Sequence, residues 1–214
     1  MDFRNLIFIK ALKSNDFKLS IVYSQAELDE VLKIVYNTYE KNGYILPNKD
    51  KIRFRENYEG SGKLSTIVAK DKCNKIAGTV GTIELSEKIL LSHAYKKELE
   101  PLLKTNKVLE ATNLVVIENK KETILFLELC RGIVYNLYKY NADYLFIEIS
   151  KKHKIFFKNI LKFTLFGDKR ISNKDTNDET IGMLLNAKEV VYGDIYKDCP
   201  KQLEFFSKYK YIIE

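Results

Sequence analysis

A carboxylate inside an apolar run is the feature of this sequence that points most directly to chemistry. The run KVLEATNLVV, residues 107–116, is typical of a buried strand, yet it contains Glu110 and Asn113. Burying even a neutral polar group without a partner costs ~2–7 kcal/mol, so an acid here needs a physical reason. A carboxyl group that is partly buried among apolar side chains is suited to proton transfer, because burial moves its pKa towards neutral. A buried ion pair with a Lys or Arg is the structural alternative.

The other reactive residue types form no metal or disulfide pattern. The chain has 214 residues, three Cys and two His, without CxxC or metal-ligand spacing. Sparse, odd-numbered cysteines favour reduced thiols. No run approaches the ~20 apolar residues that span a membrane, and the N-terminus lacks the apolar segment and cleavage site of a signal peptide. We therefore expect a cytoplasmic protein that holds no metal.

The net charge of +7 limits the choice of partners. A basic excess can serve nucleic acid, an anionic membrane surface or an acidic protein. Lys and Glu are interleaved along the chain, and no zinc-finger, RRM or KH signature is present. We expect no nucleic-acid partner. Peripheral membrane contact and an acidic protein partner are compatible with the charge, and so is a plain solvated surface.

Hydrophobic periodicity and turn residues predict alternating helices and strands. Residues 24–42 carry apolar side chains at helical spacing, between a Ser24–Glu27 capping box and an Asn42–Gly43 stop. The runs 64–70 and 75–85 are joined by a turn and predict an antiparallel hairpin. The remaining elements are expected to be a short helix over 95–103 broken near Pro101, a strand (107–117), a long helix (123–140), a buried strand (143–149), a helix (153–163), a hairpin (164–169 and 180–185) and a C-terminal helix.

This order of elements predicts a mixed α/β sheet with helices on both faces. Strand, long helix, buried strand and helix form a βαβα unit, which a helix and an antiparallel hairpin precede. On the long helix, Glu128 and Arg131 stand one turn apart. That spacing predicts an ion pair worth only ~0.2–0.5 kcal/mol.

The order of elements, with an acid in the strand before the long helix, resembles the GNAT acyltransferase fold. Within it, the chain is most similar to the long-chain N-acyl amino acid synthases of the autoinducer-synthase branch. The likeness covers about residues 20–190. It implies a mostly antiparallel sheet with a splayed parallel pair, in a single domain over 1–214 with extensions at 1–19 and 196–214. The stretches that carry it are IVYNTYEKNGYI (34–45), LLSHAYKKELEPLLKTNKVLEATNLVV (90–116) and ISKKHKIFFKNILKFTLFGDKR (149–170).

The resemblance assigns roles to single residues. Glu110 would be the general base, placed where the parallel strands splay apart. The backbone N–H groups of Val115, Val116 and Ile117 would bind the thioester carbonyl, with ordinary sheet pairing as the alternative. Further residues would line the substrate site. These are Asn113, where relatives often have Arg; Phe157, where they have Tyr; and His153, which matches the family's His, with a structural role as its alternative. Apart from the resemblance, Arg53 and Arg55 in a polar connection are candidates to clamp an acceptor carboxylate by bidentate hydrogen bonds, with plain surface charges as the alternative.

The acyl donor follows from a departure from the GNAT pattern. The turn at residues 118–122 has no glycine, whereas most GNAT enzymes use a glycine-rich turn to hold the pyrophosphate of coenzyme A. An acyl carrier protein presents its acyl chain on 4'-phosphopantetheine and needs no such turn, so it fits better than acyl-CoA, and no separate cofactor is expected. Carrier proteins are acidic, and five lysines could dock one, although each also fits a solvated surface: Lys151, Lys152, Lys154, Lys158 and Lys162.

The expected reaction is transfer of a long-chain fatty acyl group from acyl carrier protein to the amino group of an amino acid or similar small amine. Two other enzymes share the fold: an acyl-homoserine lactone synthase and a coenzyme A-dependent GNAT N-acetyltransferase. A non-catalytic GNAT module that binds lipid or carrier protein is an alternative of another class. Retention of Glu110 favours an enzyme.

Overall fold

The computed structural model describes residues 3–53, 64–86, 94–117, 121–167, 170–171 and 179–211. The first half contains α1 (Phe3–Leu12), β1 (Lys18–Ile21), α2 (Gln25–Lys41), β2 (Ser65–Lys70), β3 (Ile76–Glu84), α3 (Lys96–Leu103) and β4 (Val108–Val116). The second half contains α4 (Glu122–Lys139), β5 (Tyr144–Ser150), η2 (Lys151–His153), α5 (Lys154–Asn159), β6 (Thr164–Leu165), β7 (Arg170–Ile171), β8 (Glu179–Asn186), α6 (Ala187–Val191), η3 (Asp194–Tyr196), α7 (Pro200–Ser207) and η4 (Lys208–Tyr211).

The strands form one eight-stranded sheet in the order β1-β2-β3-β4-β5-β8-β6, with β7 also paired to β8. Only β4 and β5 run parallel among the strands that the structure describes, and the other pairs are antiparallel. The predicted mixed sheet with a single parallel pair is therefore confirmed. Both predicted hairpins also form, β2 with β3 and β6 with β8.

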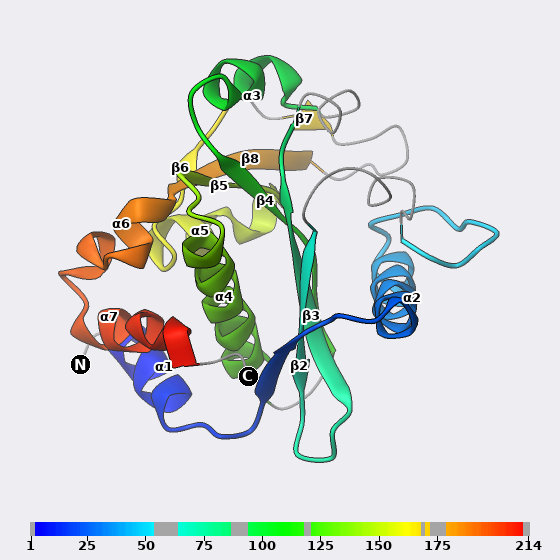
Figure 1. Cartoon of the computed structure of the whole chain (residues 1–214), viewed down its shortest axis with the longest axis horizontal. Coiled ribbons are helices and arrows are strands. Elements are labelled where there is room, and N and C mark those ends of the chain that lie inside the picture. Colours follow the sequence, from blue (N-terminus) through cyan, green and yellow to red (C-terminus); the bar gives the residue numbers. More distant parts are fainter. Residues whose placement is uncertain are drawn as a thin grey trace.

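Helices cover both faces of the sheet, as the sequence predicts (Figure 1). The long helix α4 packs across one face, and its apolar residues share a single core cluster with residues of α1, α5, α6 and α7. On the other face, α2 packs over β2 and β4 through Val31 and Val35. The short helix α3 packs over β4 and β5 through Leu99. The second face is thus covered by two separate helices rather than one continuous layer.

A local signal explains where α2 begins. The Ser24 hydroxyl accepts a hydrogen bond from the Glu27 N–H (3.2 Å), which confirms the predicted cap of α2. Two expectations are wrong. The helix predicted over 153–163 is only α5 with the preceding η2, and Lys162 has a left-handed φ of 66° that no helix continues through. Pro101 does not break α3, which continues to Leu103.

The two ends of the chain pack together on the α4 side of the sheet. Figure 1 shows α1 and α7 side by side. The ring of Phe8 lies 5.6 Å from that of Phe205 and 5.7 Å from that of Phe206, all three fully buried or nearly so. Neither α1 nor β1 is predicted from the sequence. Both depend on distant packing partners that local periodicity does not reveal.

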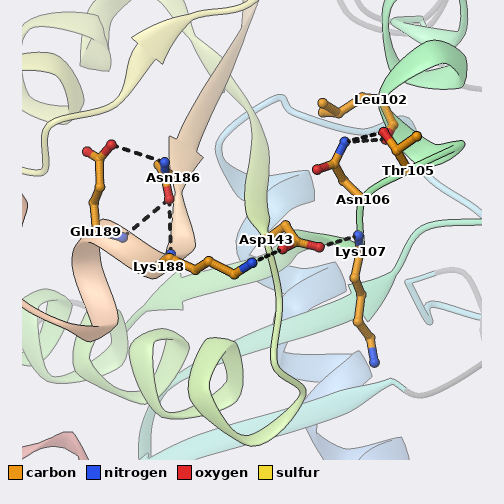
Figure 2. A network of polar contacts seen from close by, with 8 residues as sticks. All are labelled: Leu102, Thr105, Asn106, Lys107, Asp143, Asn186, Lys188 and Glu189. Carbon is orange, nitrogen blue, oxygen red and sulfur yellow. Dashed lines mark hydrogen bonds and ion pairs between the residues drawn. The ribbon is translucent and has the colours of Figure 1, made fainter.

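A polar network fastens the start of the parallel pair (Figure 2). The Asp143 carboxylate, just before β5, accepts a hydrogen bond from the Lys107 N–H just before β4 (2.8 Å). Its other oxygen binds the Lys188 ammonium of α6 at 2.6 Å. The hydrogen bond from Lys188 contributes most to lowering the pKa of Asp143, and the Lys107 N–H lowers it further. Asn186 in turn caps α6 by accepting from the Lys188 and Glu189 N–H groups.

Asp143→Asn should weaken the fold at neutral pH and not at acidic pH. The folded protein holds the Asp143 pKa below its ordinary value of 3.8, so this stabilisation is present above that value. It is lost as the pH falls through the lower folded pKa, because the carboxyl group then takes up a proton. We expect a loss of about 1.5–3 kcal/mol in the free energy of unfolding at neutral pH, as for hydrogen bonds to a charged group.

Urea unfolding of both proteins across this pH range measures the difference. Asp198→Asn is the matched control, because Asp198 is exposed and forms no ion pair with a Lys or Arg of the described ranges. A destabilisation that persists unchanged below pH 3.8 would show that the charge of Asp143 does not hold the strands together.

Candidate active site

The parallel pair is short, and Glu110 stands where it ends. Val108 lies opposite Tyr144, Leu109 opposite Leu145, and Glu110 opposite Phe146. Beyond that point, among the strands that the structure describes, β4 pairs only with β3, and β5 pairs only with β8. The two strands therefore diverge immediately after Glu110, and the edges that face each other across the gap have no strand partner there.

A β-bulge in β4 lies on the edge of this gap. Gly81 of β3 pairs with Thr112 and Thr79 pairs with Val115, so β4 contains one residue more than β3 in this interval. Within it, Asn113 has a left-handed φ of 52° and is 2% exposed. Asn is one of the few residues that adopts this conformation readily. The bulge accounts for the polar residue inside the apolar run.

Glu110 lies on the face of the sheet that α2 and α3 share. Side chains alternate along a strand, so Glu110 lies on the same face as Val108, which packs with Leu99 of α3. The extra residue of the bulge reverses the alternation, and Val115 then returns to this face, where it packs with Val31 of α2. Glu110 is half-buried between the two clusters. It therefore sits between the two helices that cover this face.

Of the three proposed oxyanion donors, the sheet leaves one available. The Ile117 N–H donates to the Ala77 carbonyl (2.8 Å), so the expectation that Ile117 binds a thioester carbonyl is wrong. Hydrogen-bonded and open positions alternate in an antiparallel ladder. The Val115 N–H then points to Thr79, and the Val116 N–H points away from β3, towards the side that β5 has left. Val116 is the backbone donor that faces the gap.

The C-terminal end of α2 and the loop after it reach both sides of the gap. The Tyr39 hydroxyl donates to the Leu114 carbonyl of the bulge (3.4 Å), and the Arg53 guanidinium lies 5.1 Å from the Tyr39 ring centroid. On the other side, the Lys152 ammonium, just after β5, donates to the Tyr44 hydroxyl (2.8 Å). Two tyrosines, an arginine and a lysine thus border the open end of the diverging strands.

Comparison with known proteins identifies the family. The sequence matches the family model described as N-acyl amino acid synthase FeeM over residues 30–186. The chain belongs to the FeeM N-acyl amino acid synthase family. The matched part contains β4, β5 and the gap between them, together with α3 and most of α2. A search among curated proteins finds no sequence match.

Solved structures share the fold of this FeeM-family protein. FeeM itself, an N-acyl amino acid synthase from uncultured soil microbes, has a TM-score of 0.67 and 22% identity, covering 81% of this chain and 92% of that one. The coenzyme A-dependent acyl-homoserine lactone synthase BjaI has a TM-score of 0.64 and 9% identity over 92% of each chain. An aminoglycoside 6'-acetyltransferase, type Ii, has a TM-score of 0.53 and 12% identity over 79% of this chain and 96% of that one. The GNAT-like fold is thereby confirmed.

The structure places the other predicted site residues of this FeeM-family chain at varying distances from the gap. Phe157 is buried among Phe126, Phe156 and Phe163 in the core cluster on the α4 side. His153 is exposed at the end of η2 and makes no side-chain cap to α5. Arg55 lies outside the described residues. The five lysines follow β5, along η2 and α5 or just after α5. Three are exposed, namely Lys151, Lys152 and Lys158, and two are half-buried, namely Lys154 and Lys162.

The sequence did not predict the surroundings of two glutamates, Glu128 and Glu148. Glu128 is 4% exposed and forms its ion pair with Arg131 inside the core, where the Arg131 guanidinium lies 4.7 Å from the Phe205 ring centroid. Burial raises the pKa of Glu128, and Arg131 opposes that rise. Glu148 lies on β5 beyond the end of the parallel pair. Its place beside the gap follows from the register between β5 and β4, which the sequence does not show.

Across the described ranges, no three His, Cys, Asp or Glu side chains gather closely enough to hold a metal ion. No helix in the same ranges is long and apolar enough to cross a membrane.

Asn113 offers a test of the bulge, because glycine and β-branched residues should behave oppositely there. Asn113→Gly should fold with a free energy of unfolding within ~1 kcal/mol of wild type, since glycine also adopts positive φ. Asn113→Val should lose about 1–3 kcal/mol, because a β-branched residue is strained at a φ of 52°. Urea unfolding of the two variants measures this. Equal stability of both would show that the bulge conformation imposes no strain at this position.

Proposed function

We propose that the protein transfers a fatty acyl group from a thioester to the amino group of an amino acid or another small amine, with Glu110 as the general base. The observation that carries the proposal is the position of Glu110, which is half-buried and stands at the last pair of β4 and β5, where the gap between these strands begins. Membership of the FeeM family supports an N-acyltransferase reaction at this place.

The proposed reaction needs a base and an oxyanion donor. An amine is protonated at neutral pH, and Glu110, directly or through a water, accepts a proton from the ammonium so that the nitrogen lone pair can attack the thioester carbon. The Val116 N–H donates to the oxygen that becomes negatively charged. The C–S bond then breaks, the nitrogen loses its second proton, and the thiolate takes up one. The products are an amide, a free thiol and one released proton.

A thiolate leaving group accounts for the absence of a general acid where relatives have tyrosine. A thiol has a pKa of about 8.5, so the thiolate leaves without protonation. Phe157 is packed in an aromatic cluster instead. The reaction therefore needs no proton donor from α5.

We propose acyl carrier protein as the donor. The sequence of residues 118–122 lacks glycine, and Lys121, which precedes α4, is held by Asp16 at 2.6 Å rather than free for a pyrophosphate. The surface after β5 combines exposed lysines with Ile155, whose side chain is 73% exposed. A basic surface with an apolar centre is complementary to an acidic carrier protein. Coenzyme A is the competing donor, because BjaI is described as coenzyme A-dependent.

Glu110→Gln should keep the fold and lower acyl transfer by roughly 10²–10⁴, which is the usual cost of losing a general base. The substitution keeps the size of the side chain and removes its ability to accept a proton. Transfer is measured by mass spectrometry of the amide product, and folding by circular dichroism. Glu84→Gln is the matched control, since Glu84 is also half-buried and lies on the neighbouring strand, paired with Lys107. Near-normal turnover in the Glu110→Gln protein would refute the assignment; loss of its fold would favour a structural ion pair.

Lys154→Glu combined with Lys158→Glu should slow the reaction with acyl carrier protein roughly tenfold, while a small soluble acyl thioester reacts as before. The carrier docks on the surface, whereas the small thioester needs only the gap beside Glu110. Higher salt should weaken the carrier reaction of the wild type, because exposed charges are screened over ~8 Å at physiological ionic strength. The control reverses two exposed lysines elsewhere, Lys33 and Lys197.

Acyl-CoA is tested beside the carrier at equal concentration. We expect it to be the poorer donor. Equal use of both donors, with no effect of the two substitutions on either, would place the carrier elsewhere and make coenzyme A an adequate donor.

A further inference from the structure

Glu148 is a second half-buried carboxylate beside the gap between β4 and β5. The reaction proposed for Glu110 does not use it. It follows Phe146 by two residues on β5, so both side chains lie on the same face of the sheet. Phe146 is paired across from Glu110, and that pair is the last between the two strands. Glu148 therefore lies on the far side of the gap from β4, with a strand neighbour, β8, on one side only.

The surroundings of Glu148 hold its carboxylate in place without neutralising it. The Thr180 hydroxyl of β8 donates to one carboxylate oxygen (2.5 Å). Opposite Glu148 is Gly182, whose N–H donates to the Tyr95 hydroxyl (2.6 Å), so the Tyr95 ring forms the adjoining wall. Within the described part of the chain, no Lys or Arg forms an ion pair with Glu148. A fixed, half-buried carboxylate without a cation is suited to bind one from a substrate.

The distance between the two acids sets the size of the molecule that both could touch. Paired strands lie about 4.8 Å apart and rise about 3.3 Å per residue, and β5 diverges from β4 beyond Phe146, so the Cα atoms of Glu110 and Glu148 are separated by roughly 8 Å or more. The side chains point the same way from the sheet. Two amino groups of one short, flexible molecule can therefore face the two carboxylates together.

We propose that Glu148 is a specificity-determining residue that binds a second ammonium group of the acceptor. The preferred acceptor is then a short diamine or a dibasic amino acid, with one amino group at Glu110 and the other at Glu148. The inference rests on the proposed function and names its class of amine. An acceptor with a methyl group in place of the second ammonium leaves Glu148 without a cation and should be used less well.

Putrescine and pentylamine test this directly, because they have nearly the same shape and differ in the second ammonium group. Wild type should have a higher kcat/KM for putrescine. Glu148→Gln should reduce the putrescine-to-pentylamine ratio of kcat/KM roughly tenfold or more, chiefly through the KM for putrescine. Glu148→Asp, which keeps the charge, should retain part of the preference. Glu30→Gln is the control, because Glu30 is exposed on α2 and has no recorded side-chain partner.

Thr180→Val separates a binding role from a structural one. If Glu148 only fastens β5 to β8 through Thr180, this substitution and Glu148→Gln should lower the use of both amines equally. That result, or a ratio that Glu148→Gln leaves unchanged, would overturn the proposal while leaving acyl transfer by Glu110 intact.

Calorimetry without an acyl donor distinguishes the two proposals. Wild type should bind putrescine, Glu148→Gln should bind it at least ~10-fold more weakly, and circular dichroism checks that the variant is folded. Binding that depends on Glu148 in a protein that acylates no amine would refute the proposed function and keep this site. Failure of wild type to prefer putrescine in both binding and transfer would refute the site alone, provided that amines are acylated.

Discussion

The short parallel pairing of β4 with β5 is the constraint on which the rest of the structure depends. The two strands are fastened at their starts, where Asp143 accepts from the Lys107 N–H, and they separate after Glu110 and Phe146. Buried backbone groups are normally paired, so strands that separate inside a sheet leave donors and acceptors for something else to satisfy. In this chain the separation coincides with the bulge at Asn113 and with the backbone N–H of Val116. These are the groups that the proposed reaction uses, with Glu110 as the base and the Val116 N–H as the donor to the substrate carbonyl.

Polar residues have different surroundings on the two faces of the sheet. Under α4, three buried polar side chains are hydrogen-bonded to one another: the Ser65 hydroxyl donates to the Asn136 amide oxygen (3.2 Å), and the Asn136 amide nitrogen donates to the Thr82 hydroxyl (2.8 Å). On the other face, Glu110 and Glu148 lie where α2 and α3 do not form a continuous layer. A satisfied buried network stabilises one unique packing. Glu110 and Glu148 are both half-buried, and they are the two carboxylates to which the proposals above assign substrate contacts.

The terminal helices complete the core on the α4 side. α1 and α7 pack against each other and cover part of α4, where the Glu128–Arg131 ion pair is enclosed beside Phe205. An ion pair at such a place gains attraction from the low dielectric and loses hydration, so removing one partner is more costly than on a surface. Both helices lie outside the part of the chain that matches the FeeM family, residues 30–186. In this chain they close the core on the α4 side.

The sequence by itself determined the elements whose signals are local, and the acid that stands out among them. Capping at Ser24, the long apolar helix and the buried strand predict α2, α4 and β5, and Glu110 is conspicuous within KVLEATNLVV. Tertiary structure alone decided which backbone amide faces the gap, because the bulge at Asn113 changes the side of the strand to which each residue points. It also decided the burial of Glu128 and the place of Glu148. Both depend on residues of another helix or strand that pack against the glutamate. The local sequence pattern does not identify these packing partners.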